Sequence, residues 1–236
     1  MPKAVVLLSG GLDSTVCLAW AKAHGYEPYA LSIDYGQRHR IELDRAAHIA
    51  RDLLAVEHRT IAIDLRSLGG SSLTSSSDVP KDRTQAEMAI GISSTYVPAR
   101  NTMLLSAALA YAETIGAFDL VFGANALDHA GYPDCRPGFF AAFTILADTA
   151  TAAGDEGRGR FRIHTPLIDK TKADIVRLGI ELGVDLSQTT SCYDPDREGR
   201  ACARCDACIL RRAGFAEAET PDPTTYRNLP GSGADR

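Results

Sequence analysis

A short apolar strand that runs through two glycines into a helix is the feature that most limits how this chain can fold. The N-terminal sequence reads VVLLSGGLDSTVCLAW, in which an apolar run leads into Ser9, Gly10 and Gly11. An apolar stretch with helical spacing begins at Asp13. A helix that starts after such a turn presents unpaired backbone N–H groups, and glycine lets an anion approach them closely. The arrangement predicts a phosphate-binding loop at the carboxyl end of the first strand.

This loop differs from the common GxxxxGK[ST] phosphate loop because no lysine follows its glycines. Ser9 and Ser14 add hydroxyl donors, but Asp13 places a carboxylate where it would repel phosphate. The carboxylate is explained if Asp13 caps the helix, or if a magnesium ion bridges it to the phosphates. A plain turn with Asp13 or Ser14 as a helix cap is the alternative for a Gly-Gly pair alone. The whole string SGGLDS favours phosphate binding.

Strand-like and helix-like segments alternate along the chain. Apolar runs typical of strands occupy residues 3–9, 29–34, 59–64, 120–124 and 161–165. Segments with helical spacing occupy residues 13–24, 40–54, 101–115, 137–153 and 172–182. This alternation predicts an α/β fold, namely a Rossmann-like, doubly wound parallel sheet with helices on both faces.

Length and composition limit the domain organisation and the partners. The 236 residues, 45% of them hydrophobic, suffice for one large domain with a small appendage. We expect a nucleotide-binding domain over residues 1–188, a helical zinc-binding extension over 189–227 and a flexible tail over 228–236. The formal net charge of −5 argues against nucleic acid as a partner. No leader or membrane-length apolar run is evident, so we expect no membrane partner and a cytoplasmic location.

Several local signals refine these boundaries. Gly116 is well placed to end the helix 101–115, and Thr171 is a plausible cap for the helix 172–182, with Asp174 three residues later. The segment 69–85 is rich in Ser, Thr and Gly and is predicted to be a mobile loop. It is either a solvated connection or a lid over a site.

Four of the six cysteines gather near the C-terminus. Cys202, Cys205 and Cys208 form CxxCxxC, and Cys192 lies ten positions before Cys202. Four thiolates in a small loop predict a tetrahedral zinc ion whose closed shell leaves no position for water, and hence a structural metal. Buried free thiols and an iron–sulfur cluster are the alternatives, whereas a reducing compartment disfavours disulfides. Cys17 is expected to fill the core. The surplus thiolate charge is expected to be offset by nearby arginines, namely Arg200, Arg204, Arg211 and Arg212.

The sequence GYPDCRPGF follows the fourth predicted strand, where a parallel sheet places its ligands. A substrate pocket would use Tyr132 for stacking, Asp134 to accept hydrogen bonds from a guanine-like ring, and Arg136 to bind a carboxylate. A rigid turn is the alternative. Asp128 and His129 belong to the same loop, where a solvated histidine is the expectation.

Three further cations have two interpretations each. Arg100, which precedes the helix 101–115, is either a surface cation or a ligand for a phosphate or carboxylate. Lys170 and Lys172 follow the last predicted strand. They are either solvated or able to neutralise a polyphosphate.

Taken together, these stretches resemble the QueC family, the 7-cyano-7-deazaguanine synthases of queuosine biosynthesis, which belong to the PP-loop ATP pyrophosphatases with their signature SGGxDS. The residues that carry the resemblance span nearly the whole chain: SGGLDSTVCL, SIDYGQRHR, YVPARNTMLLSAALA, GYPDCRP, TPLIDKTKADI and SCYDPDREGRACARCDACILR. Two positions depart from the family pattern. Ala203 stands where members often carry glycine, and Gly138 where they often carry an acidic residue.

The resemblance implies an ATP-dependent ligase that converts 7-carboxy-7-deazaguanine and ammonia to 7-cyano-7-deazaguanine by activating first the carboxylate and then the amide. It implies ATP as a substrate, Mg²⁺, one structural zinc ion per subunit held by the four cysteines, and a homodimer. The implied catalytic residues are Asp13, Ser14 and Lys172. The implied ATP site consists of the loop and three residues after the second strand: Leu8, Ser9, Gly10, Gly11, Leu12, Asp13, Ser14, Thr15, Val16, Cys17, Leu18, Asp34, Tyr35 and Gln37. Our hypothesis for the substrate contacts is Arg100, Tyr132, Asp134 and Arg136.

Two other functions compete. Some PP-loop enzymes transfer sulfur to tRNA, but that activity usually needs a basic RNA-binding surface, which the net charge does not favour. Alternatively, the four cysteines form a zinc module for docking on an inactive nucleotide fold. The intact SGGLDS argues against an inactive site.

Overall fold

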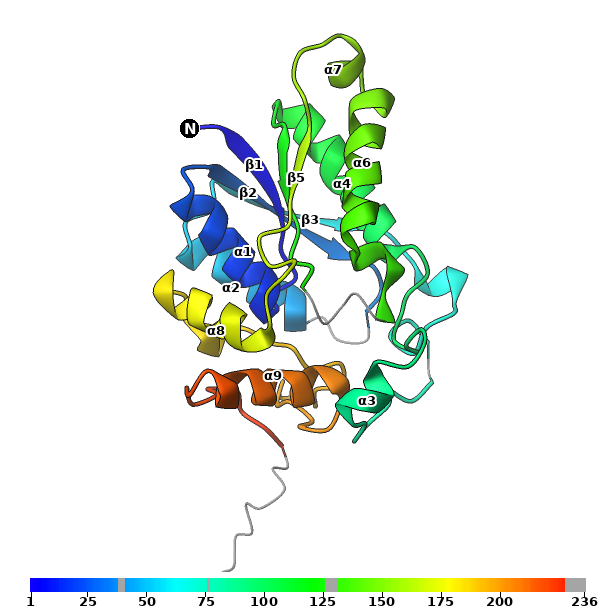
Figure 1. Ribbon diagram of the computed structural model, residues 1–236, viewed down its shortest axis with the longest axis vertical. Coiled ribbons are helices and arrows are strands. Elements are labelled where there is room, and N and C mark those ends of the chain that lie inside the picture. The colour runs from blue at the N-terminus through cyan, green and yellow to red at the C-terminus, as the bar shows by residue number, and fades with distance from the viewer. Residues whose placement is uncertain (38–40, 76, 126–130, 228–236) are drawn as a thin grey trace, which may run out of the picture.

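The computed structural model describes residues 1–37, 41–75, 77–125 and 131–227, drawn as the coloured ribbon in Figure 1. The predicted flexible tail, residues 228–236, lies outside the described residues, as do Asp128 and His129. No helix in the described part of the chain is both long enough and apolar enough to cross a membrane.

Five parallel strands form one sheet. They are β1 (Lys3–Leu7), β2 (Glu27–Asp34), β3 (Glu57–Ala62), β4 (Asp119–Val121) and β5 (Arg162–His164). Their order is β3-β2-β1-β4-β5, and every neighbouring pair is parallel. The strand order therefore reverses between β1 and β4, and in open α/β sheets ligands bind beyond the carboxyl ends of the strands at this reversal. The predicted parallel α/β fold is confirmed.

Helices cover both faces of the sheet (Figure 1). They are α1 (Leu12–Ala23), α2 (Ile41–Asp52), α3 (Gln85–Met88), α4 (Arg100–Ile115), α6 (Pro137–Ala150), α7 (Ala152–Asp155), α8 (Lys172–Glu181) and α9 (Asp206–Glu217). The central strand serves both faces: Ala4 and Val6 pack with α1 and α8, whereas Val5 and Leu7 pack with α4 and α6. Alternate side chains of a strand point to opposite faces, which explains the unbroken apolar run of β1.

Three local predictions about helix ends can be compared with the structure. Gly116 ends α4 in the left-handed conformation, with φ 68°. Thr171 and Asp174 form a capping box at the start of α8. Both predictions are confirmed. The single helix predicted over residues 137–153 is wrong, because Thr151 is extended and caps a separate short helix, accepting a hydrogen bond from the Gly154 N–H.

Residues 71–82, which follow β3, pack against the cysteine-containing segment, residues 192–208. Leu73 and Val79 are buried in one apolar cluster with the four cysteines. Lys81 forms an antiparallel bridge with Cys205, and the Asp82 N–H donates a hydrogen bond to the Arg204 carbonyl oxygen at 2.8 Å. The alternative of a solvated connection is therefore wrong for residues 71–74 and 79, which are buried. A lid role for this segment stays a prediction.

Candidate active site

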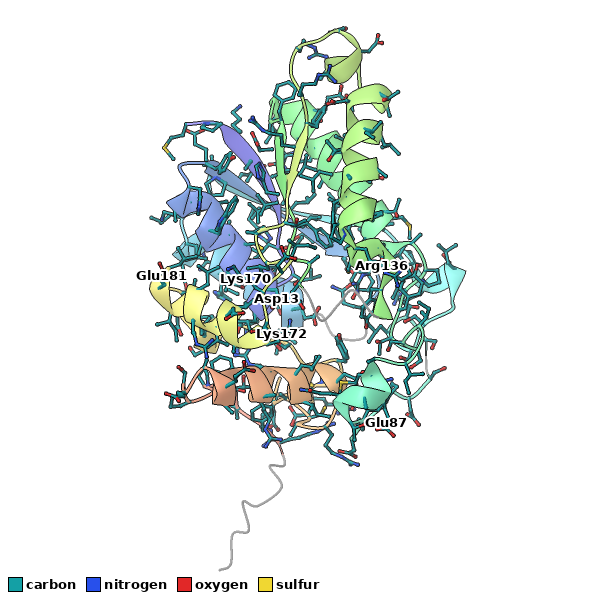
Figure 2. The ribbon with its side chains drawn as sticks, viewed as in Figure 1. Asp13, Glu87, Arg136, Lys170, Lys172 and Glu181 are labelled. Atoms are coloured by element: carbon teal, nitrogen blue, oxygen red, sulfur yellow. The ribbon has the colours of Figure 1, made fainter. Side chains whose placement is uncertain are left out.

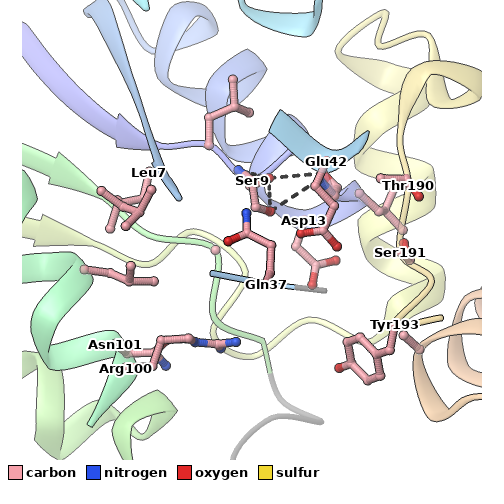
Figure 3. Close-up of a pocket in the computed structure, with 18 of the residues that line it drawn as sticks. Leu7, Ser9, Asp13, Gln37, Glu42, Arg100, Asn101, Thr190, Ser191 and Tyr193 are labelled. Atoms are coloured by element: carbon pink, nitrogen blue, oxygen red, sulfur yellow. Dashed lines mark hydrogen bonds between the residues drawn. The ribbon is translucent and has the colours of Figure 1, made fainter. Parts of the chain in front are cut away.

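A cavity of about 300 Å³ opens beyond the carboxyl ends of β1, β2 and β4. Its walls come from segments that lie far apart in the sequence (Figure 3). Polar lining residues include Ser9, Asp13, Ser14, Tyr35, Gln37, Glu42, Arg100, Asn101, Tyr132, Lys172, Thr190, Ser191 and Tyr193. The cavity lies where the strand order reverses, which is where this fold is expected to bind a ligand.

The SGGLDS loop is held by its own hydroxyl groups. The Ser14 hydroxyl accepts a hydrogen bond from the Ser9 N–H at 3.2 Å, lies 3.0 Å from the Ser9 hydroxyl, and donates to the Gly11 carbonyl oxygen at 3.1 Å. Gly11 is the N-cap residue of α1, so no side chain caps this helix start. The alternative in which Asp13 or Ser14 is a plain cap is therefore wrong, and the first turn of α1 keeps backbone donors for an anion.

Gly10 is required by both its conformation and its surroundings. Its φ is +80°, and a Cβ at this position would lie 2.5 Å from the Glu42 carbonyl oxygen. The first turn of α2 therefore packs directly on the loop. On the other side, the Thr190 N–H donates a hydrogen bond to the Gly10 carbonyl oxygen at 3.0 Å. The loop is clamped between α2 and the segment that leads to the cysteines.

Asp13 lies at the centre of the polar contacts in this cavity. Its Oδ2 accepts hydrogen bonds from Lys172 Nζ at 2.5 Å and from Asn125 Nδ2 at 3.0 Å. Its Oδ1 is buried and has no hydrogen-bond partner among the described residues. Buried carboxylate oxygens normally have a partner, and Mg²⁺ prefers oxygen ligands. This unpaired oxygen beside an anion-binding loop therefore fits a magnesium ion.

Lys172 supplies the cation that the loop itself lacks. It is the first residue of α8, and its ammonium group reaches Asp13 across 159 residues of sequence. Figure 2 shows Lys172 and Asp13 next to each other, with Lys170 above them. Lys172 lines the cavity, whereas Lys170 does not. Of the two lysines, Lys172 is therefore the one that lies at the cavity, and its role in neutralising a phosphate stays a prediction.

The predicted ATP residues separate into two groups. Leu8, Ser9, Gly11, Leu12, Asp13, Ser14, Tyr35 and Gln37 line the cavity. The remaining residues of the predicted set do not: Gly10, Thr15, Val16, Cys17, Leu18 and Asp34. Val16, Cys17 and Leu18 are buried in the core, as expected for Cys17. Asp34 accepts a hydrogen bond from the Gly36 N–H at 3.1 Å and so stabilises the turn after β2.

Glu42 is a cavity residue that the sequence pattern did not reveal. It lies in the first turn of α2, and Figure 3 shows its carboxylate beside that of Asp13. Burial raises the pKa of Glu42 from 4.5 to about 7, although the Arg100 guanidinium opposes this rise. The sequence could have indicated Glu42 only by its position shortly after the end of the second strand.

The four predicted substrate residues are not all in the cavity. Arg100 and Tyr132 line it, and the Arg100 guanidinium carbon lies 5.8 Å from the centre of the Tyr35 ring. Asp134 is buried and accepts a hydrogen bond from the Asn101 N–H at 3.1 Å, at the start of α4. Arg136 is exposed at the start of α6 (Figure 2). Neither Asp134 nor Arg136 is among the lining residues, and their contact with substrate stays a prediction.

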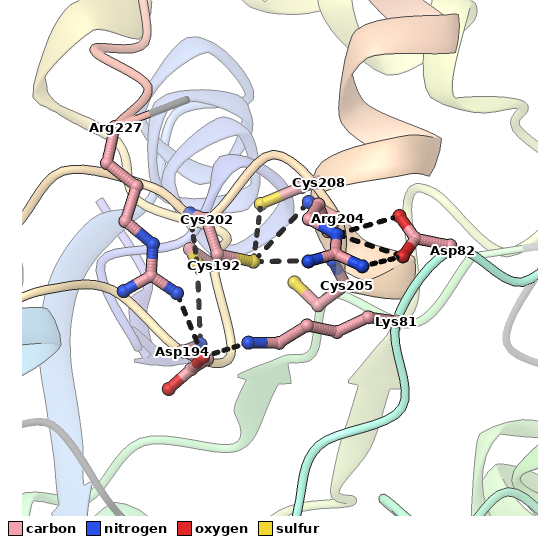
Figure 4. Close-up of polar contacts among 9 residues, drawn as sticks. All are labelled: Lys81, Asp82, Cys192, Asp194, Cys202, Arg204, Cys205, Cys208 and Arg227. Atoms are coloured by element: carbon pink, nitrogen blue, oxygen red, sulfur yellow. Dashed lines mark hydrogen bonds and ion pairs between the residues drawn. The ribbon is translucent and has the colours of Figure 1, made fainter. Parts of the chain in front are cut away.

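The four C-terminal cysteines converge on one point (Figure 4). The sulfur atoms of Cys192, Cys202, Cys205 and Cys208 all lie within 4.8 Å of one another, and all four residues are buried and free of disulfides. Zinc–sulfur bonds of about 2.3 Å require sulfur atoms about 3.8 Å apart in a tetrahedron. The sulfur atoms of Cys202 and Cys208 are 3.9 Å apart. The cluster could therefore hold a single metal ion.

Backbone amides donate hydrogen bonds to the cysteine sulfur atoms. The Cys192 sulfur accepts hydrogen bonds from the N–H groups of Cys202 at 3.1 Å and Asp194 at 3.3 Å. Arg200, Arg204 and Arg211 are instead paired with the carboxylates of Asp196, Asp82 and Asp222, respectively. The carboxylate pairs reduce the charge that these three arginines can lend to the thiolates, but Arg204 still interacts electrostatically with Cys202. The prediction that nearby arginines offset the thiolate charge therefore stays a prediction.

Comparison with known proteins covers nearly the whole chain. Residues 3–219 match the family model described as queuosine biosynthesis protein QueC. The 7-cyano-7-deazaguanine synthase of Geobacter metallireducens is 58% identical over 227 residues, which cover 96% of this chain and 94% of that protein. The enzyme of the same name from Myxococcus xanthus is 56% identical over 224 residues, which cover 95% of this chain and 97% of that protein.

Proposed function

Because this chain belongs to the QueC family, we propose that it is an ATP-dependent ligase that makes 7-cyano-7-deazaguanine from 7-carboxy-7-deazaguanine and ammonia in queuosine biosynthesis. The proposal depends on one observation. The SGGLDS loop lies where the strand order reverses, Asp13 lines the cavity, and Lys172 Nζ lies 2.5 Å from Asp13 Oδ2. This is an anion site whose cation comes from another part of the fold.

The chemistry explains why ATP is needed. A carboxylate has no good leaving group, so ammonia cannot displace its oxygen. Transfer of an adenylyl or phosphoryl group from ATP to the carboxylate, with release of pyrophosphate or ADP respectively, provides that leaving group. Attack by ammonia then forms an amide and releases AMP or phosphate. Loss of water from the amide to form the nitrile requires its oxygen to be activated in the same way. Most of the rate enhancement then comes from positioning and charge neutralisation rather than from a protein nucleophile.

In this proposal each group of cavity residues has a different role. The backbone N–H groups and the hydroxyls of Ser9 and Ser14 bind the phosphates, and Lys172 neutralises their charge. Asp13, whose Oδ1 has no partner among the described residues, would hold a Mg²⁺ ion, and such an ion would supply further neutralisation of the phosphate charge. Tyr35 and Gln37 contact the nucleoside. Arg100 and Tyr132 bind the deazaguanine acid.

The four cysteines hold a structural zinc ion in this proposal. Their compact arrangement and the backbone N–H donors to sulfur support it. We also propose a reducing, cytoplasmic location, in which the thiols stay available for the metal. We further propose a homodimer of chains with a nucleotide-binding domain over residues 1–188 and a zinc-binding extension over 189–227.

Mass spectrometry of the products formed from ATP, ammonium and 7-carboxy-7-deazaguanine tests the proposal. We expect the amide and then the nitrile, each dependent on ATP. The double variant Asp13→Ala, Ser14→Ala should form neither compound while keeping its four cysteines and its metal. If the parent protein hydrolyses ATP but leaves the acid unchanged, the proposal is wrong. ATP-dependent sulfur incorporation into tRNA would then support the sulfur-transfer alternative.

A further inference from the structure

A chain of hydroxyl groups leads from the cysteine-containing segment to Tyr132 in the cavity wall. Thr95 Oγ1 lies 2.7 Å from the Tyr132 hydroxyl, and Ser93 Oγ lies 2.8 Å from Thr95 Oγ1. The Arg83 guanidinium donates to Ser93 Oγ at 3.3 Å. None of these three upstream residues lines the cavity. Among the residues that the structure describes, this chain of hydrogen bonds reaches the cavity at Tyr132.

Arg83 is held in place at the other end of this chain. Its Nε donates to Asp206 Oδ1 at 3.1 Å, and a second guanidinium nitrogen also contacts the Asp206 carboxylate. Asp206 is the first residue of α9 and directly follows Cys205. The hydrogen bond with Asp206 raises the pKa of Arg83. Arg83 is therefore always charged and can only donate hydrogen bonds.

The direction of each hydrogen bond follows from this fixed donor. A serine hydroxyl has two acceptor positions and one hydrogen. Ser93 Oγ accepts from Arg83 and also from the Thr95 N–H at 3.3 Å, so its own hydrogen is available for Thr95 Oγ1.

The hydrogen bond between Ser93 and Thr95 in turn fixes the direction of the one between Thr95 and Tyr132. Thr95 is 1% exposed, so its hydroxyl hydrogen cannot reach solvent, and leaving a buried donor without a partner is costly. Since Thr95 Oγ1 accepts from Ser93, its hydrogen is donated to the Tyr132 oxygen. The hydroxyl hydrogen of Tyr132 then has to find an acceptor elsewhere, and Tyr132 lines the cavity.

We propose that Thr95 is a positioning and specificity-determining residue that makes the Tyr132 hydroxyl a hydrogen-bond donor toward the bound substrate. The complementary substrate atom is an acceptor oxygen, either of the carboxylate or of the ring carbonyl of the deazaguanine acid. This inference rests on the proposed function and deepens it, because it gives Tyr132 a polar role in addition to stacking. A ligand that presents an N–H group at the same position is disfavoured, since two donors would then face each other.

Calorimetric titration with 7-carboxy-7-deazaguanine, in the presence of a non-hydrolysable ATP analogue, tests the inference without relying on turnover. Thr95→Val should weaken binding of the acid about tenfold, the range expected for one hydrogen bond to a charged or carbonyl oxygen. Thr95→Ser keeps the hydroxyl and should bind as the parent does. The affinity for the ATP analogue should be the same in all three proteins.

A double-mutant cycle separates positioning from packing. Tyr132→Phe removes the donor, so adding Thr95→Val to it should cause no further loss of affinity for the acid. Thr114→Val is the matched control, because this exposed threonine on α4 donates only to the Ala110 carbonyl oxygen, at 2.8 Å. If Thr95→Val does not fold, Ser93→Ala breaks the same chain one residue earlier and should weaken acid binding in the same way.

The possible outcomes are distinct. If the parent does not bind the acid, the proposed function fails, and this inference fails with it. If the parent binds and Thr95→Val binds equally well, only this inference is overturned. It is also overturned if both ligands weaken together, if Thr95→Ser does not restore binding, or if the two substitutions add fully in the cycle.

Discussion

The ammonium group of Lys172 lies 2.5 Å from the carboxylate of Asp13, although 159 residues separate them. The contact joins the first turn of α8 to the first turn of α1, and both residues line the cavity. It explains how the proposed phosphate-binding loop, which has no lysine of its own, obtains a nearby positive charge. The relationship also makes Lys172 the residue whose loss should reveal most about the site.

Replacing Lys172 with methionine should abolish the ATP-dependent reaction and destabilise the fold. The side chains of Lys172 and Asp13 are only 17% and 21% exposed, so the variant leaves a largely buried carboxylate without its main partner. Losing one member of such a pair costs up to about 3 kcal/mol. Initial rates and urea denaturation measure the two effects. Lys170→Met is the control and should change neither, because Lys170 does not line the cavity. Equal losses of rate and stability in Lys172→Met and Lys170→Met would contradict the role assigned to Lys172.

Gly10→Ala should damage the loop more than a glycine substitution elsewhere. The new Cβ would lie 2.5 Å from the Glu42 carbonyl oxygen in addition to the unfavourable φ of +80°. Gly157→Ala shares the unfavourable backbone, with φ +66°, but meets no atom within 4 Å. We expect a cost of about 1 kcal/mol for Gly157→Ala and clearly more for Gly10→Ala. Denaturation midpoints and nucleotide affinity give the comparison. If Gly157→Ala lost nucleotide binding while Gly10→Ala kept it, this account of Gly10 would be wrong.

Ala203→Gly should stabilise the cysteine-containing segment. Ala203 has φ 63°, a left-handed conformation that glycine adopts without strain. We expect a gain of about 0.5–1 kcal/mol, after allowing for the greater freedom of glycine in the unfolded chain. The matched control is Ala213→Gly in the middle of α9, which should lose about 1 kcal/mol. Urea midpoints at constant slope measure both variants. A destabilised Ala203→Gly protein would refute this account of the turn.

The contribution of Glu42 to the stability of the protein should fall as the pH rises from about 4.5 to about 7. Burial raises the pKa of Glu42 from 4.5 to about 7 in the folded state. Across this window the folded protein holds a proton that the unfolded chain releases, so the unfolding free energy decreases with pH. The cost at pH 8 is at most about 3 kcal/mol.

Glu42→Gln should therefore be more stable than the parent at pH 8 and no more stable at pH 4. Thermal or urea denaturation at the two pH values measures the difference. Asp44→Asn, an exposed carboxylate on the same helix, serves as the control and should show no such dependence. Parallel pH profiles for the parent and Glu42→Gln would rule out a raised pKa for Glu42.

Cys208→Ser should lose the bound metal and unfold the C-terminal extension. Its sulfur belongs to a buried group of four whose members lie within 4.8 Å of one another, and three ligands no longer close a tetrahedral shell. Elemental analysis should find one zinc ion per chain in the parent and none in the variant. Cys17→Ala is the control and should keep its metal, since Cys17 lies on α1 and is buried in the core. Iron with visible absorption in the parent would favour the iron–sulfur alternative.

The local features of this protein could be predicted from the sequence because their signals are themselves local. The apolar runs identified all five strands, Gly116 and Thr171 identified two helix ends, and CxxCxxC with Cys192 identified four residues whose sulfur atoms do converge. Spacing along the chain is sufficient for such predictions, since each depends on the periodicity of one element or on one short loop.

Only the tertiary structure decided which side chains share the cavity. It pairs Lys172 with Asp13, adds Glu42, and turns Asp134 toward the start of α4, none of which follows from spacing along the chain. It also buries Leu73 and Val79 against the cysteines. These contacts depend on how helices pack on a twisted sheet, and the partner of a charge is whichever opposite charge the packing brings within reach. The sequence by itself therefore determined the elements and the loop chemistry, whereas packing decided the neighbours of each functional group.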